Sequence, residues 1–94
     1  MAIARVVSFE DVSSERMTEL QRRVDEGEPP EGMPPVEVLV LHDADGGRAL
    51  VVQLFDSEEE YRRGEAAFSA MPPTDTPGRR AAVSRYDVAA RMRP

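Results

Sequence analysis

The sequence predicts an α+β fold of the ferredoxin-like class, with the element order β-α-β-β-α-β. Such a fold has a four-stranded antiparallel sheet with two helices on one face. Two apolar segments, 36–43 and 48–56, flank an Asp-Gly turn, which is the strongest short-range signal for a β-hairpin. A serine-capped helical segment follows this hairpin directly, and a strand-like segment and a helix-like segment precede it. We therefore expect one ferredoxin-like domain that spans residues 1–94.

The first half of the chain predicts a strand, a helix and a loop. Residues 3–10 alternate with the two-residue period of a strand. After this strand, a helix is expected to run to about Glu26. Gly27 follows it, at the position where helix ends favour glycine. Its candidate N-caps are Asp11, Ser13 and Ser14, and its expected buried stripe consists of Met17, Leu20 and Val24. Residues 28–35 contain four prolines and are expected to form an exposed loop within the domain.

The second half predicts the hairpin, a second helix and the last strand. Gly46 and Gly47 are expected to supply the positive φ angles of the hairpin turn. Ser57 and Glu60 have the spacing of a capping box at the start of the second helix. The buried side of that helix is expected to carry Tyr61, Gly64, Ala67, Phe68 and Met71. Pro72 and Pro73 end it, and strand alternation resumes over residues 80–88.

Composition narrows the classes of partner. The chain has no cysteine, so it has neither disulfides nor thiolate metal ligands. A net charge of -6 argues against binding to nucleic acid, which depends on basic residues that neutralise phosphates. We find no signal peptide and no apolar run long enough to span a membrane, so we expect a cytoplasmic protein without membrane contact. No metal or cofactor is expected.

Both faces of the predicted sheet are apolar, whereas a single ferredoxin-like sheet should leave one polar face in water. One register was expected to face the helices because its side chains are small or branched: Ala4, Val6, Ser8, Val36, Val38, Val40, Leu50, Val52, Leu54, Ala82, Ser84 and Val88. The other register carries Val7, Phe9, Leu39, Leu41, Val51, Phe55 and Val83. An exposed apolar face of this size predicts a homodimer in which two sheets pack face to face.

The chain resembles the dimeric α/β-barrel superfamily, and within it the antibiotic-biosynthesis-monooxygenase-like domains. The resemblance lies in VEVLVLHDADGGRALVVQLFDSEEEYRRGEAAFSAM, in the closing strand RRAAVSRYDV and in the order of elements. It implies a ligand cavity between the helices and the sheet or inside the barrel. Members include cofactor-independent oxygenases, haem-degrading enzymes, isomerases and proteins without a known reaction. The oxygenases use asparagine, tryptophan and histidine near the substrate, and this chain contains only the histidine.

That histidine, His42, lies at the end of a predicted strand, just before the hairpin turn. It is a candidate general base because the ordinary pKa of histidine lies near neutral pH, and Asp43 or Asp45 would orient it. The alternative is that His42 is an exposed hairpin residue. A metal site at His42, Asp43 and Asp45 is not expected, because these residues alternate between the two sides of the strand.

The register expected to face the partner also contains four polar residues, which are candidate ligand-binding residues: Arg5, Glu37, Gln53 and Arg85. The first and last strands of this fold are neighbours, so Arg5 and Arg85 are expected to lie close together and to attract an anion. The alternative is that both arginines pair with Glu37 or Asp87 across the dimer interface. Tyr61 is a further candidate that would place a hydroxyl in the cavity, and its alternative role, like that of Tyr86 on the helix-facing register, is core packing.

The function expected from the sequence is that of a small dimeric α/β-barrel protein whose apolar cavity binds a small aromatic or polyketide-like compound. One alternative is a cofactor-independent monooxygenase or isomerase that uses His42 or a tyrosine, with an arginine to stabilise a developing anion. A second alternative is a structural or regulatory dimer without a ligand.

Overall fold

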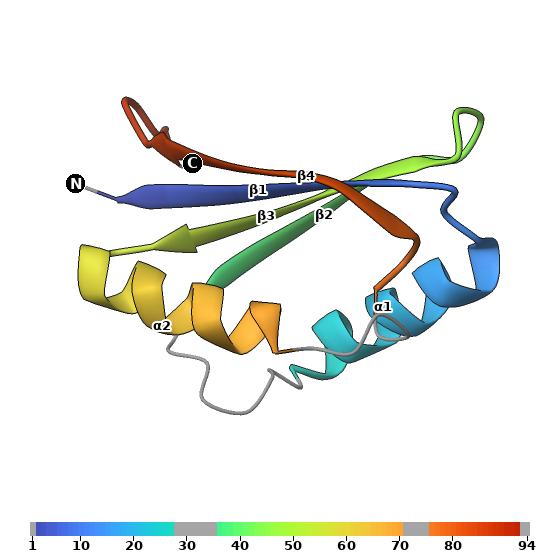
Figure 1. Cartoon of the computed structure of the whole chain (residues 1–94), viewed down its shortest axis with the longest axis horizontal. Helices are drawn as coiled ribbons and strands as arrows, with labels where there is room; N and C mark the ends of the chain where they lie inside the picture. The colour runs from blue at the N-terminus through green and yellow to red at the C-terminus, as the bar shows by residue number, and fades with distance from the viewer. Residues whose placement is uncertain (1, 28–35, 71–75, 93–94) are drawn as a thin grey trace.

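A computed structural model describes residues 2–27, 36–70 and 76–92, and it confirms the ferredoxin-like fold. The elements are β1 (Ile3–Glu10), α1 (Ser14–Glu26), β2 (Glu37–Asp43), β3 (Arg48–Phe55), α2 (Glu58–Ser69) and β4 (Arg79–Asp87). All neighbouring strands are antiparallel, in the order β2-β3-β1-β4. Both helices lie on one side of the sheet (Figure 1). The predicted loop at 28–35, with Met33, and the predicted helix end at Met71, Pro72 and Pro73 lie outside the described residues.

The helix ends follow the predicted capping residues. Ser13 accepts a hydrogen bond of 3.2 Å from the backbone N–H of Arg16, and Gly27 ends α1 in the left-handed conformation with φ 68°. At α2, Ser57 accepts a hydrogen bond of 3.2 Å from the N–H of Glu60. The Glu60 carboxylate in turn accepts from the N–H of Asp56, one residue before the cap. Both helices therefore begin where side-chain oxygens satisfy amides that the helix leaves free.

The hairpin turn differs from the prediction at one glycine. Gly47 has the expected positive φ, 64°, but Gly46 does not, so the expectation for Gly46 was wrong. The carboxylate of Asp43 instead closes the turn, because it accepts a hydrogen bond of 3.0 Å from Gly46 N–H and pairs with Arg48 at 2.7 Å. A Cβ at Gly46 would lie 2.5 Å from the Asp43 carboxylate, so a side chain there would displace that carboxylate.

The sheet faces are inverted relative to the prediction on β1, β3 and β4. One buried cluster joins Val7, Phe9 and Val51 to Leu20 of α1, and another joins Ile3 and Phe55 to Tyr61 of α2. The larger side chains therefore face the helices, together with their register partners on the same side, among them Arg5, Gln53, Val38 and Arg85. Tyr86 was also misassigned: it pairs with Ala4 on the other face and is 59% exposed.

The reason for this inversion lies in how the helices pack. Phe55 is fully buried against Gly64 in the middle of α2, where a Cβ would lie only 2.3 Å from the Phe55 ring. The missing side chain of Gly64 makes room for a large aromatic ring, so the bulky register fills the space between the layers. The sizes of the residues alone do not reveal this fit between Phe55 and Gly64.

The opposite face of the sheet, which we call the open face, is apolar as expected but has a different composition. Its side chains include Val6, Leu39, Leu41, Leu50, Val52 and Leu54. Leu39, Leu41 and Leu50 are 47%, 50% and 38% exposed. The segment after β4 turns back on the side of the sheet opposite the helices (Figure 1). Val88 N–H donates to the carbonyl of Ala2, and Arg91 forms an ion pair with Glu37 on the far edge strand. Within the described residues, no helix is long and apolar enough to cross a membrane.

Candidate functional site

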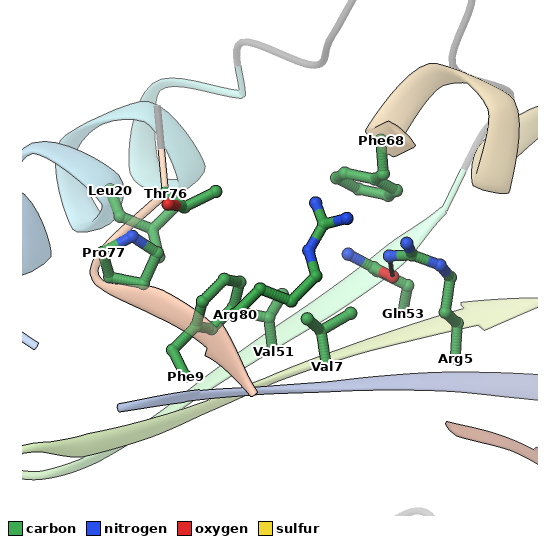
Figure 2. A pocket seen from close by; sticks show the side chains of 10 residues that line it. All are labelled: Arg5, Val7, Phe9, Leu20, Val51, Gln53, Phe68, Thr76, Pro77 and Arg80. Atoms are coloured by element: carbon green, nitrogen blue, oxygen red, sulfur yellow. Dashed lines mark hydrogen bonds between the residues drawn. The ribbon is translucent and has the colours of Figure 1, made fainter. Parts of the chain in front are cut away.

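A cavity of about 50 Å³ lies between the sheet and the two helices (Figure 2). Strands β1 and β3 form its floor, α1 and α2 contribute one residue each, and the segment that leads into β4 closes one side. Its lining consists of Arg5, Val7, Phe9, Leu20, Val51, Gln53, Phe68, Thr76, Pro77 and Arg80. Most of these side chains are apolar, so the few polar groups decide what the cavity can recognise.

Arg5 and Gln53 are the buried polar residues of this floor, and each is 2% exposed. They are direct register partners on β1 and β3, and Arg5 Nη1 donates a hydrogen bond of 3.1 Å to Gln53 Oε1. The guanidinium also stacks over Phe68, with its central carbon 5.2 Å from the ring centroid. The hydrogen bond and the ring together hold the Arg5 side chain in one orientation.

The charge of Arg5 is not neutralised by the described part of the chain. Its Nε–H is buried and has no hydrogen-bond partner, and no described carboxylate lies within ion-pair distance. Burial lowers the pKa of Arg5, and the neighbouring charge of Arg80 lowers it further, while Glu65 and Tyr61 act in the opposite direction. Arg5 thus places a desolvated positive charge in the lining of the cavity, and its buried Nε–H has no acceptor.

Arg80 adds a second positive group, and its side chain is exposed. Figure 2 shows its guanidinium directed toward the Phe68 end of the cavity, where Arg5 also lies. Nearby, Thr76 accepts a hydrogen bond of 3.2 Å from Arg16 and donates one of 2.8 Å to the carbonyl of Gly78. The cavity is therefore an apolar chamber with positive charge at one end.

Two other predicted site residues, Arg85 and Tyr61, contact each other beside this cavity. Arg85 is the register partner of Arg5 on β4, as expected, but its guanidinium forms two hydrogen bonds with Glu58 of α2, at 2.9 and 2.5 Å. Arg85 also lies over the ring of Tyr61, 4.8 Å from its centroid, and Tyr61 packs edge-on against Phe55. Burial raises the pKa of Tyr61. Neither residue is part of the cavity lining.

Glu37 and His42 lie away from the cavity. Glu37 is on the open face, where it pairs with Arg91, so the structure separates it from Arg5, Gln53 and Arg85. His42 is exposed at the end of β2, and no hydrogen bond with another described residue holds its ring. Asp43, its expected orienting partner, is occupied by Arg48 and Gly46. A catalytic role for His42 stays a prediction.

Sequence reasoning missed Arg80 and Thr76 as parts of the site. Arg80 reaches the cavity because a register shift between Ser8 and Phe9 pairs it with Phe9. Strand alternation alone gives no sign of such a bulge. Among the described residues, no group of three histidine or acidic side chains has the arrangement of a metal site.

Comparisons with known proteins identify solved structures that share this fold. No protein-family model matches the chain, and no curated protein matches it. A crystal structure from Chloroflexus aurantiacus, of a protein provisionally described as an antibiotic biosynthesis monooxygenase, has a TM-score of 0.61 at 13% identity, and the match covers 98% of this chain and 97% of that one.

Two further solved structures are similar. Rv0793 from Mycobacterium tuberculosis has a TM-score of 0.55 at 12% identity, with 99% of this chain and 100% of that chain covered. A second provisional antibiotic biosynthesis monooxygenase, from Bacillus cereus, has a TM-score of 0.52 at 17% identity, with 100% and 97% covered. Identities this low establish the fold alone. The chain therefore has the ferredoxin-like fold of the antibiotic-biosynthesis-monooxygenase-like structures, which confirms the predicted resemblance at the level of the fold.

Proposed function

We propose that the protein binds a small, partly apolar organic compound in the cavity between the sheet and the helices. The observation that carries this proposal is the pairing of apolar walls with one fixed polar pair, Arg5 and Gln53, on the floor. Ligand sites in proteins commonly combine an apolar lining with a few convergent polar groups.

The size of the cavity limits the part of the ligand that enters it. The volume of about 50 Å³ is larger than a single water molecule needs. It is smaller than the volume of about 150 Å³ of an apolar cavity that holds benzene, so a whole aromatic ring does not fit inside. An aromatic or polyketide-like compound would therefore insert one edge or one substituent, with the rest of the molecule at the exposed end beside Arg80.

Two measurements test this proposal: a titration with phenol, and the same titration of a variant in which a larger side chain fills the cavity. Phenol is titrated into the ¹⁵N-labelled protein, with amide shifts as the readout. We expect saturable shifts at residues of the cavity, and we expect the Val51→Phe variant to lose them because the larger ring occupies the same space. Leu41→Phe, on the open face, is the matched control and should retain them. Equal responses from wild type and a folded Val51→Phe variant would contradict binding in this cavity and favour the structural or regulatory alternative.

The same function includes a homodimer that buries the open face. Support for it comes from Leu39, Leu41 and Leu50, which form with Val52 an apolar surface on adjacent strands. Contiguous apolar surfaces of this kind are uncommon on monomers and suit a two-fold contact in which the same patch meets itself.

An enzyme is the second candidate, as a cofactor-independent monooxygenase or isomerase. A buried guanidinium favours this alternative, because a fixed donor in a dry site stabilises an oxyanion that develops during reaction. Two of the similar structures carry a monooxygenase description. Against it, the lining given by the described residues includes no carboxylate or imidazole that would accept a proton. Binding is therefore the first proposal and catalysis the second.

A further inference from the structure

Arg5 is the one buried arginine among the described residues, and no described carboxylate pairs with it. Acidic residues outnumber basic ones by 18 to 12, and most described arginines contact a carboxylate. These paired arginines include Arg22, Arg48, Arg62, Arg79, Arg85 and Arg91. Arg5 is more deeply buried than any of them, yet it has no such partner. A buried charge ordinarily requires a counter-charge, because removal from water is costly.

The nearest acidic influence on Arg5 does not satisfy it. Glu65 of α2 acts on Arg5 through its charge alone, and it adds to burial in raising the pKa of Tyr61. Among the described residues, the one hydrogen-bond acceptor for the Arg5 guanidinium is the neutral oxygen of Gln53, and the Nε–H of Arg5 has no acceptor. A buried donor without a hydrogen bond destabilises the fold, and more so when the group is charged.

Arg80 increases this deficit. It lines the same cavity, forms no hydrogen bond or ion pair with another described residue, and disfavours the charge of Arg5. Two positive groups next to one apolar chamber repel each other unless an anion lies between them.

We propose that the ligand of this cavity carries a carboxylate, which pairs with the guanidinium groups of Arg5 and Arg80, while its apolar body contacts the apolar side chains of the lining. This inference rests on the proposed function and names the ligand class. A planar carboxylate matches guanidinium donors in geometry, and charge-assisted hydrogen bonds are about twice as strong as neutral ones. The cavity volume of about 50 Å³ also suits a group of this size.

Benzoate and its neutral isostere benzamide test the charge of the ligand. Both are titrated into the full chain in HEPES buffer without other carboxylates, with the ¹H–¹⁵N resonance of Arg5 Nε as the readout. We expect benzoate to bind about tenfold more tightly than benzamide and to shift this resonance, since a charged acceptor then pairs with the Arg5 guanidinium. Benzoate binding should also weaken as salt rises.

Variants locate the contact. Arg80→Gln should weaken benzoate about tenfold and leave benzamide unchanged, whereas Arg63→Gln, an exposed arginine on α2, should change neither. Arg5→Met should abolish the preference for benzoate. If that variant fails to fold, the exposed Arg80 position still decides the question.

Each outcome separates the two proposals. Equal binding of benzoate and benzamide would overturn the carboxylate and leave the binding cavity intact. Inorganic phosphate that competes as well as benzoate would replace the carboxylate by a general anion site and overturn the inference. A protein that binds neither benzoate, benzamide nor phenol would overturn both the inference and the proposed function.

Discussion

Arg5 and Gln53 are joined across β1 and β3 by a hydrogen bond of 3.1 Å, and each of these polar side chains is 2% exposed. The pair interrupts an otherwise apolar layer, between the Ile3–Phe55 and Val7–Val51 register pairs. Its members depend on each other, because each would be left in the core without its partner.

A double-mutant cycle measures this dependence. Gln53→Leu in the wild type removes the acceptor of a buried charged donor, so we expect a loss of about 1.5–3 kcal/mol in the free energy of unfolding. In an Arg5→Met background the same change should be close to neutral, because both polar partners are then gone. Urea unfolding of the four proteins gives the coupling energy, and equal effects of Gln53→Leu in both backgrounds would contradict the dependence.

The contact between Gly64 and Phe55 should determine how closely α2 approaches the sheet. Gly64→Ala places a Cβ 2.3 Å from a fully buried ring, so we expect overpacking of about 1–3 kcal/mol, against a gain of about 1 kcal/mol in helix propensity. A net loss of up to about 2 kcal/mol should appear in thermal or urea unfolding. The same substitution in a Phe55→Leu background is the control, and it should be neutral or stabilising. If Gly64→Ala stabilised the wild type, the close contact would be refuted.

The residue types of the sequence predict the helices and strands of this protein better than they predict the packing of its interior. Ser13, Gly27 and Ser57 cap helices because their chemistry acts locally, within a few residues. The faces of the sheet depend on non-local fit, and nothing near Phe55 in the sequence indicates that Gly64 leaves space for its ring. Arg5 and Gln53 were predicted together as site residues, but Arg80 joins them through a register shift that alternation does not reveal.

The hairpin offers a test of the single positive φ in its turn. Gly47→Ala should cost about 1–2 kcal/mol, because a Cβ in the left-handed region clashes with the backbone. Gly47→Asn is the matched control and should cost less, since asparagine adopts this conformation more readily. The two variants are compared by the midpoint of urea unfolding. Indistinguishable midpoints would argue against a left-handed residue at this position.

If a homodimer forms through the open face, a charge introduced there should dissociate it. Leu39→Glu and Leu41→Glu place a carboxylate in the open face, so they should convert a dimer into a monomer of 10.4 kDa, as measured by light scattering after size exclusion. Val24→Glu introduces the same charge at a similarly exposed position on α1 and should leave the dimer intact. A monomeric wild type, or dissociation caused equally by Val24→Glu, would contradict a contact through the open face.

The ion pair of Glu58 with Arg85 should make stability depend on pH in the acid range. Hydrogen bonding to Arg85 lowers the pKa of Glu58 below its usual value near 4.5, so folding favours the ionised carboxylate. The stabilisation is therefore complete above the usual pKa and disappears as the pH falls through the lowered pKa of the folded state. Glu58→Gln should be less stable than wild type at pH 7, and the difference should shrink below about pH 4.5. Glu59→Gln is the control, because Glu59 occupies the same first turn of α2 but contacts no described arginine. Unfolding midpoints for all three proteins between neutral and acid pH check this prediction, and a constant difference between Glu58→Gln and wild type across that range would refute the role of the pair.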